Sequence, residues 1–142
     1  MRFWDSSALL PLLVREATSK TVAATYEADP SVVAWWGSQI ECASALARLE
    51  REDRLAGAGL TVALGRLAEF AAAWHEVQPV APVRQIAIRL LRVHELRATD
   101  SLQLAAAVVA ADGQPATMAF VSLDDRLAVA ADREGFPVIQ PH

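Results

Sequence analysis

The sequence predicts an α/β fold in which a short, mostly parallel central sheet is covered by helices on both faces. Short apolar segments such as "SVVAW" and "MAFVS" alternate along the chain with longer segments of helical periodicity. The short segments are apolar throughout instead of alternating, which is typical of parallel strands buried on both faces. The chain has 142 residues, no internal repeat and no long linker. We therefore expect a single domain over residues 1–142.

The first half of the chain contains two expected strands and four expected helices. Pro11 is tolerated if it lies in the first turn of its helix, and the small-residue segment 56–59 is expected to end the third helix. In that third helix, Ile40 lies on an apolar side and Glu41 on a charged side. The expected strands cover 1–4 and 31–35, and the expected helices cover 6–15, 18–28, 38–54 and 60–74.

The second half continues the alternation. Leu90 and Val93 share one side of the helix expected at 82–94, and the next helix is apolar nearly all round apart from Gln103, which predicts a buried helix. In chain order we expect an extended piece at 77–83, helices at 82–94 and 99–111, a strand at 118–122, a helix at 124–134 and a last strand at 136–140.

Composition excludes several classes of protein. Hydrophobic residues make up 54% and charged residues 21%, which is unlike a disordered chain. The net charge of −4 argues against nonspecific nucleic-acid binding, which depends on Lys and Arg. A single cysteine, Cys42, excludes an intramolecular disulfide, and no Cys/His cluster suggests zinc. With no signal peptide and no span-length apolar run, we expect a soluble cytoplasmic protein that does not bind membranes.

Four carboxylates stand near the starts of helices that follow strands. Asp5 follows the first strand and Asp124 follows the strand at 118–122, while Glu41 and Asp100 lie at the beginnings of two further helices. In open α/β sheets, ligands bind outside the carboxyl ends of the strands. All four acids could therefore converge at one edge of the sheet.

Each acid also has an ordinary structural explanation. Asp5 could be a helix N-cap, Glu41 a solvated surface acid, and Asp124 a residue stabilised by the helix dipole. Asp100 fits such an explanation least, because it heads an apolar helix in which Thr99 already offers a cap. The conjunction of four such acids favours a carboxylate cluster over four unrelated caps.

A carboxylate cluster cannot stay fully ionised without cations. Oxygen ligands, with no cysteine or suitably spaced histidine, indicate Mg²⁺ or Mn²⁺. One or two such ions, about 3.5–4 Å apart when paired, are a common way to perform phosphoryl-transfer chemistry. The sequence therefore predicts a divalent-metal site for phosphoryl transfer.

The segments "FWDSSALL", "QIECASALARL", "LRATDSLQLAAA" and "FVSLDDRLAVAA" together resemble the PIN-domain ribonucleases. Within that family the chain is most similar to the VapC-like toxins of type II toxin–antitoxin pairs, from Phe3 to Val138. The resemblance implies a PIN-like three-layer sandwich and a metal-dependent endoribonuclease that hydrolyses RNA phosphodiester bonds with metal-activated water. It also implies Mg²⁺ or Mn²⁺ as cofactor, a homodimer, and a cognate antitoxin as protein partner.

The resemblance assigns roles to individual residues. Ser7 and Ser122 occupy small hydroxyl positions that orient carboxylates or water, and the fourth acid falls on Asp124 and not on the neighbouring Asp125. The family's metal ligands, which also frame the attacking water, fall on Asp5, Glu41, Asp100 and Asp124.

Several other residues keep two interpretations. Trp35 and Trp36 replace a smaller, more polar turn and either pack against neighbouring helices or stack on a base. A group of arginines is either a solvated helix face or a phosphate contact; its members are Arg84, Arg89, Arg92 and Arg97. His75 and His94 lack ligand-spaced partners and are interpreted as structural or surface residues, and Cys42 as a small core residue.

Two other classes of function remain alternatives. A different divalent-metal phosphoryl-transfer enzyme, such as a haloacid-dehalogenase-like phosphatase, usually needs an aspartate where this chain has Ser7. A receiver domain needs a late lysine, whereas the only lysine here is Lys20. A non-catalytic PIN-like binding module usually lacks some of the acids, and this chain has all four.

Overall fold

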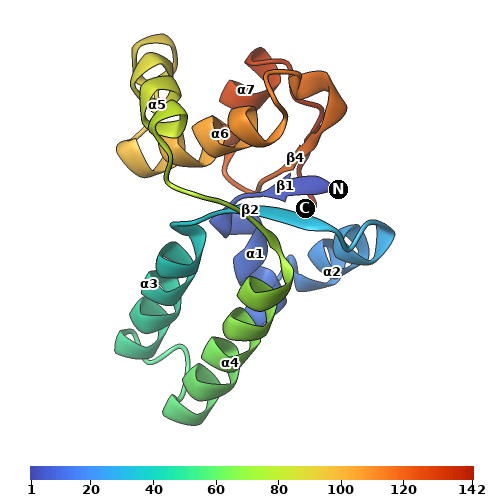
Figure 1. Cartoon of the computed structure of the whole chain (residues 1–142). Coiled ribbons are helices and arrows are strands. Elements are labelled where there is room, and N and C mark those ends of the chain that lie inside the picture. The colour runs from blue at the N-terminus through green and yellow to red at the C-terminus, as the bar shows by residue number, and fades with distance from the viewer.

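The computed structural model describes all of residues 1–142 and has a five-stranded, entirely parallel sheet between two helical layers (Figure 1). This confirms the α/β class and the PIN-like three-layer arrangement that were expected from the sequence. The strand order is β3-β2-β1-β4-β5, with β1 central. The strands are β1 (Arg2–Trp4), β2 (Val32–Trp35), β3 (His75–Val77), β4 (Ala119–Val121) and β5 (Val138–Ile139).

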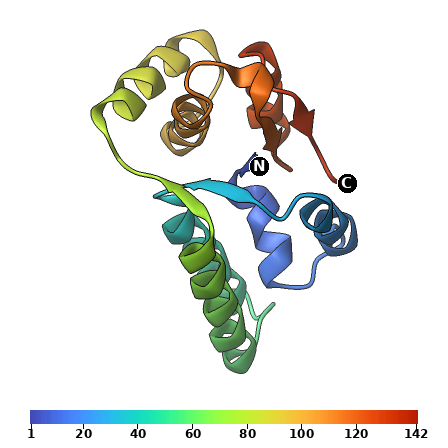
Figure 2. The same cartoon turned by 45° about the vertical axis from the view of Figure 1, so that its right-hand side comes forward.

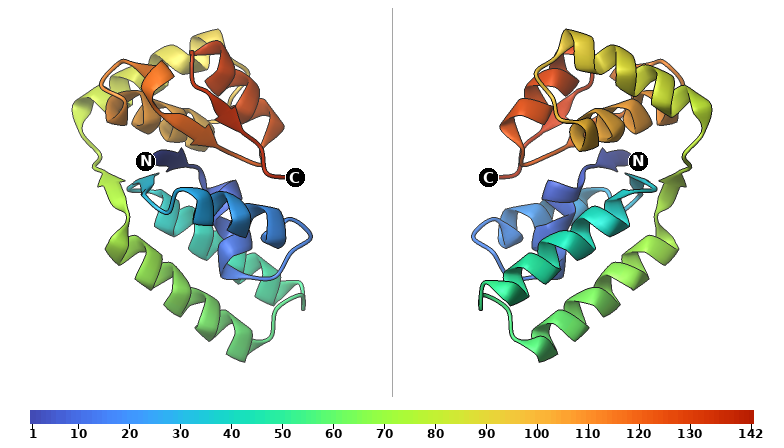
Figure 3. Two further views of the ribbon diagram at one scale, coloured as in Figure 1. Left: turned by 90° about the vertical axis from the view of Figure 1, so that its right-hand side faces the viewer. Right: turned by 90° about the vertical axis from the view of Figure 1, so that its left-hand side faces the viewer.

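Seven α-helices cover the two faces of the sheet, and Figures 2 and 3 show the two layers from the side. The first layer contains α1 (Ser6–Leu13), α2 (Ser19–Ala28), α3 (Ser38–Arg51) and α4 (Gly57–Ala73). The second layer contains α5 (Ala81–Val93), α6 (Ala98–Ala110) and α7 (Asp125–Arg133), and a single 3₁₀ turn covers Pro115–Thr117.

The inner strands β2 and β4 and most of β1 are apolar because they separate two cores, whereas the edge strand β3 contains His75 and Glu76. Successive side chains of a strand point to opposite faces, so Phe3 packs under α5–α7 while Trp4 packs among α1–α4. Phe3 stacks on Phe120 of β4 with ring centroids 5.3 Å apart, and Trp4 meets Tyr26 edge-on at 6.4 Å. Hydrophobic burial on both faces therefore fixes the short strands without any alternation in sequence.

The buried helix expected near the end of the chain is α6. Its residues Leu104 to Ala107 are fully buried, and α5 lies against it through Val83, Ala87 and Leu90. Gln103 and Ser101 are the buried polar residues of this otherwise apolar surface. As a result, α6 is held rigidly beside the sheet, with its N-terminus near the carboxyl ends of the strands.

The boundary between α3 and α4 differs from the prediction. The third helix ends at Arg51 instead of 54, and the segment 56–59 begins α4 instead of ending α3. The turn is made by Asp53, whose φ of 55° lies in the left-handed region that Asp tolerates better than most residues. The glycines of 56–59 were therefore misinterpreted as the break.

Two other local expectations were wrong. Pro11 is the sixth residue of α1, in its second turn, and the helix ends at Leu13 rather than 15. The segment 77–83 is not uniformly extended, because β3 ends at Val77 and α5 begins at Ala81.

The helical faces also differ from those expected. Ile40 and Val93 are 61% and 60% exposed, so neither belongs to a core. The buried side of α3 consists of Ser38, Cys42 and Leu46, spaced at four residues. Ile40 lies two positions from that row, which places it on the opposite side of the helix.

No helix has both the length and the low charge that crossing a bilayer requires.

The α5–α6 contact gives a test of the packing. Leu90→Ala should lower the free energy of unfolding by about 2–5 kcal/mol, because it opens a cavity at a fully buried position. Leu91→Ala changes the same residue type on the same helix at a position that is 42% exposed, and should cost less than about 1 kcal/mol. Urea denaturation measures both; equal losses would contradict the described packing of α5.

Candidate active site

The edge of the sheet formed by the carboxyl ends of the strands brings two of the four acids together. Asp5 follows β1 directly and Asp124 follows β4, and these strands are neighbours. The Asp5 backbone N–H donates to the Val121 carbonyl at 3.1 Å, so pairing extends to this point. The strand that follows β1 in the chain, β2, lies on one side of it, and β4 lies on the other side. The gap between β1 and β4 is therefore the topological switch point, where α/β sheets bind ligands.

Asp5 is buried, with only 2% of the residue exposed. Both oxygens of its carboxylate accept hydrogen bonds. Oδ1 accepts hydrogen bonds from the Ser7 hydroxyl at 2.5 Å and the Ala8 N–H at 3.1 Å, and Oδ2 accepts from the Ser122 hydroxyl at 2.6 Å. Asp5 is therefore an N-cap of α1 and a fixed carboxylate at the same time.

The two hydroxyls that hold Asp5 also hold the β4–α7 connection. The Leu123 N–H donates to Ser7 Oγ at 2.9 Å, and the Asp124 N–H donates to Ser122 Oγ at 3.0 Å. Each serine thus accepts from the loop and donates to Asp5. This places the Asp124 backbone relative to the Asp5 carboxylate.

Glu41 lies in the first turn of α3 and is half-buried, unlike a solvated surface acid. Its Oε1 accepts from the Ser6 hydroxyl at 3.3 Å, and its Oε2 accepts from the Gln103 amide at 2.8 Å. Glu41 therefore contacts α1 and α6, one from each helical layer.

Asp100 and Asp124 both cap helices. Asp100 is the third residue of α6, and its Oδ2 accepts from the Arg97 N–H at 3.4 Å; Asp124 Oδ1 accepts from the Leu127 N–H at 3.0 Å. The expected cap at Thr99 was wrong, because the N-cap of α6 is Arg97 and Thr99 is exposed. Asp100 is half-buried, because the N-terminus of α6 opens onto the surface.

Electrostatic repulsion links all four acids. Burial, with a smaller contribution from the charge of Asp124, raises the pKa of Asp5 to about 6 despite the lowering effect of its hydrogen bonds. Burial raises the pKa of Glu41, as do the charges of Asp5 and Asp100. Burial and the charge of Asp124 raise the pKa of Asp100, partly offset by Arg97 and Arg126. Each carboxylate therefore lies within the field of at least one other, in a region short of positive charge.

A polar pocket of about 500 Å³ opens over two of the acids. No apolar residue lines it; its walls are Arg97, Thr99, Asp100, Asp124, Asp125 and Arg126. The Asp125 carboxylate instead accepts from the Gln140 amide at 3.1 Å, beside β5. The structure therefore separates Asp124, whose carboxylate caps α7 at the pocket, from Asp125, whose carboxylate contacts the last strand.

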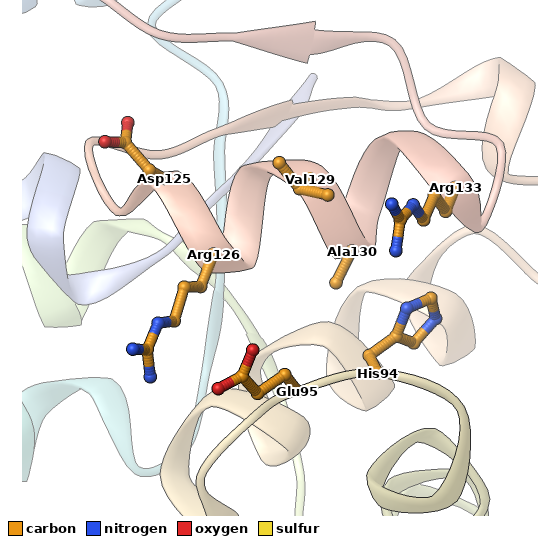
Figure 4. A pocket seen from close by; sticks show the side chains of 7 residues that line it. All are labelled: His94, Glu95, Asp125, Arg126, Val129, Ala130 and Arg133. Atoms are coloured by element: carbon orange, nitrogen blue, oxygen red, sulfur yellow. The ribbon is translucent and has the colours of Figure 1, made fainter.

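A second pocket, of about 310 Å³, continues along α7 (Figure 4). It shares Asp125 and Arg126 with the first pocket. In Figure 4, Arg126 and Arg133 project from α7 toward the segment before α6, and Asp125 points away from them. The lining residues are His94, Glu95, Asp125, Arg126, Val129, Ala130 and Arg133.

The residues with two interpretations are now placed. Trp35 is buried in the core beside α6, whereas Trp36 is 46% exposed. Arg89 forms an ion pair with Glu134 at 3.1 Å, and His94 Nε2 lies 2.7 Å from the same carboxylate, so both connect α5 to α7. Cys42, the expected core residue, is fully buried, and burial raises its pKa to about 12.

Comparison with known proteins finds relatives of this chain. No protein-family model matches it. Two ribonucleases of Mycobacterium tuberculosis, VapC45 of strain CDC 1551 and VapC49 of strain H37Rv, are each 32% identical to it over 110 residues, which is 78% of this chain and 76% of theirs. The chain belongs to the VapC ribonuclease family.

Solved structures agree with the VapC fold. The chain superposes on VapC20 of M. tuberculosis, a toxin that cleaves the sarcin–ricin loop, with a TM-score of 0.71 and 18% identity over 99% of this chain and 100% of that one. FitAcB from Neisseria gonorrhoeae gives 0.70 and 20% identity over 99% and 98%, and a toxin–antitoxin complex from Klebsiella pneumoniae gives 0.68 and 13% over 100% and 98%. At these identities the likeness concerns the fold.

The donor set of this VapC-family chain fits a hard divalent cation. The acids offer only oxygen ligands, and their mutual repulsion is what a cation would relieve. As the side chains are arranged, no three His, Cys, Asp or Glu residues lie close enough to hold one ion. Direct binding by three of these carboxylates would therefore need their side chains to move closer together.

Three residues of the candidate site were not predicted from the sequence. Gln103 was noticed only as a polar exception in an apolar helix, and that exception was the available signal. Ser6 was overlooked between Asp5 and Ser7, although it contacts Glu41. Arg126 follows Asp125 within the fourth motif, and only the fold places it at the pocket.

The raised pKa of Asp5 predicts a pH dependence of stability in metal-free protein. The folded state holds the Asp5 proton up to about pH 6, above the ordinary value of 3.8. Stability from this group is therefore highest below about pH 4 and falls as pH rises through 6, by about 3 kcal/mol in total. Urea denaturation in EDTA from pH 4 to 7 should show a larger loss in the parent than in Asp5→Asn, which keeps the smaller losses from Glu41 and Asp100.

Asp125→Asn is the matched control, because it changes an exposed neighbour of the site and leaves Asp5 intact. Asp125→Asn should show the same dependence of unfolding free energy on pH as the parent. A slope that is the same in the parent and in Asp5→Asn would contradict the assigned burial of the Asp5 charge.

Proposed function

We propose that this chain is a metal-dependent endoribonuclease that serves as the toxin of a toxin–antitoxin pair, with residues 1–142 acting as one domain. The observation that carries the proposal is the electrostatic coupling of four acids from four elements at the switch point of the sheet. Its relatives being named ribonucleases supports the activity. Nothing in the site favours the phosphatase-like alternative.

Asp5, Glu41, Asp100 and Asp124 would hold Mg²⁺ or Mn²⁺. When bound, such an ion supplies positive charge that stabilises the transition state of phosphodiester hydrolysis and makes water a better nucleophile. The protein's part is to keep the carboxylates in place. Asp5 cannot rotate, because Ser7 and Ser122 hold its two oxygens from opposite sides.

Hydrolysis adds one water across a P–O bond of the RNA and needs a group to take a proton from that water. The site contains no histidine or lysine for this step, since the polar pocket is lined by acids, arginines and Thr99. The proton would pass to a carboxylate oxygen of the site that does not hold the cation.

The RNA backbone would run from the polar pocket along α7 into the second pocket. The chain is acidic overall, so phosphate contacts have to come from local arginines. Arg97, Arg126 and Arg133 border the two pockets and take part in none of the chain's ion pairs, which involve only Met1, Arg2, Arg89 and His94 as cations. These three guanidinium groups are free to bind phosphates.

The partners follow from the same family. An antitoxin protein is proposed because one structural neighbour is a toxin–antitoxin complex. We also propose a homodimer and a cytoplasmic location, where RNA is accessible. Size-exclusion chromatography with light scattering tests the dimer, which should run at about twice the 15.3 kDa of the chain.

Removal of one acid should abolish cleavage. Asp100→Asn keeps the size of the side chain and removes a charge, so RNA cleavage in Mg²⁺ or Mn²⁺ should fall at least about 100-fold, and EDTA should stop the parental enzyme. Asp124→Asn should behave similarly, whereas Asp125→Asn should stay within about 3-fold of the parent. Gel assays with a labelled RNA measure all three.

Circular dichroism melts confirm that each variant is folded. Cleavage that survives both Asp100→Asn and EDTA would rule out the metal mechanism. Equal losses in Asp124→Asn and Asp125→Asn would contradict the assignment of Asp124 as the site residue.

The phosphate path predicts a binding defect in Arg126→Gln. The apparent KM for RNA should rise about 3- to 10-fold with little change in kcat, and the slope of log KM against log salt should decrease by about 0.7, one single-strand phosphate. Arg51→Gln, an exposed arginine at the end of α3, is the control and should leave KM unchanged. Equal KM values in both variants would show that RNA does not cross α7.

A further inference from the structure

A buried amide in α6 contacts the candidate site from behind. Gln103 is 1% exposed and lies among Leu104 and the alanines that follow it in the core. Burying an amide in an apolar core costs free energy unless its polar atoms are hydrogen-bonded. A leucine would pack at this position without that cost, so the hydrogen bonds of Gln103 are the reason to examine it.

The amide connects α6 to α3. Gln103 Nε2 donates to Glu41 Oε2 at 2.8 Å and to Ser38 Oγ at 3.0 Å, which uses both of its N–H groups. Its Oε1 lies 3.3 Å from the Ser38 hydroxyl. Ser38 and Glu41 are one turn apart on α3, so a single amide contacts the start of that helix at two points.

We propose that Gln103 is a positioning residue that holds the Glu41 carboxylate toward the other three acids. This rests on the proposed function of the site. The Gln103 amide fixes Oε2 of Glu41 and the Ser6 hydroxyl fixes Oε1. Asp5 is held in the same way, by one hydroxyl on each of its two oxygens.

The chemistry of the amide suits this role. An amide donates hydrogen bonds without adding charge, so Glu41 stays available to a cation. A lysine or arginine at the same point would neutralise the carboxylate and compete with the cation. An aspartate or glutamate would repel it.

The position of Gln103 on α6 relates Glu41 to Asp100. Asp100 lies three residues earlier, one turn toward the N-terminus and on the same side of the helix. Because Glu41 is bound to α6 through Gln103, its distance from Asp100 is set by one rigid helix. Without that link, Glu41 would be held to the site only by the Ser6 contact, at 3.3 Å.

Gln103→Met tests the role, because methionine has a similar shape and no donor. We expect the Kd for Mn²⁺, measured by calorimetry on the full chain, to rise about 10-fold, the low end for residues that orient metal ligands. With RNA at saturating Mn²⁺, kcat should fall about 10-fold while KM changes less than 3-fold. Gln85→Met is the matched control: it makes the same substitution at an exposed position of α5 and should leave both quantities near the parental values.

A double-mutant cycle separates positioning from packing. In a Glu41→Gln background, Gln103→Met should change the Kd for Mn²⁺ less than 2-fold, because there is no carboxylate left to position. If Gln103→Met misfolds by circular dichroism, Gln103→Asn, whose amide is one methylene shorter, is measured in its place.

A parental Kd and kcat in the Gln103 variant would overturn the inference while leaving the proposed function intact. So would a full 10-fold effect that persists in the Glu41→Gln background. A parent chain that neither binds Mn²⁺ nor cleaves RNA would overturn both.

Discussion

The buried carboxylate of Asp5 is the interaction on which the rest of the site depends. It lies at the end of the central strand, where burial alone would expel a charge. Ser7 and Ser122 make that position tolerable, and the same two hydroxyls accept the N–H groups of the β4–α7 connection. One network of short hydrogen bonds therefore joins β1, α1 and the start of α7, and brings Asp124 beside Asp5.

The charges of the four acids at this edge of the sheet repel one another. Burial raises the pKa values of Asp5, Glu41 and Asp100, and repulsion among the acids adds to this rise, which Arg97 and Arg126 offset in part at Asp100. A divalent cation would lower the free energy of such a cluster. The same repulsion between the acids would therefore favour cation binding and destabilise the metal-free protein. Asp100 and Asp124 each use one carboxylate oxygen to cap a helix. The other oxygen of each carboxylate is left for a cation.

Much of this arrangement is predictable from the sequence, for identifiable reasons. Apolar strands and the apolar α6 follow from burial on both faces, and Asp5 and Asp124 follow from their position after strands. The α3–α4 turn was misplaced because a single aspartate, Asp53, adopts the left-handed conformation that glycine usually supplies. The contact between Gln103 and Glu41 joins residues 62 positions apart, and no local pattern encodes such a pair. The N-cap of α6 was placed two residues too late, at Thr99 instead of Arg97, because the helix already begins at Ala98.

The central claim is that these four carboxylates hold a divalent cation between them. Crystals soaked in Mn²⁺ and measured at the manganese absorption edge test it most directly. We expect an anomalous peak at the carboxyl edge of the sheet, with oxygens of Asp5 and at least two of Glu41, Asp100 and Asp124 at about 2.0–2.3 Å, as hard divalent ions require. Anomalous density confined to other acids, or none at millimolar Mn²⁺, would contradict it.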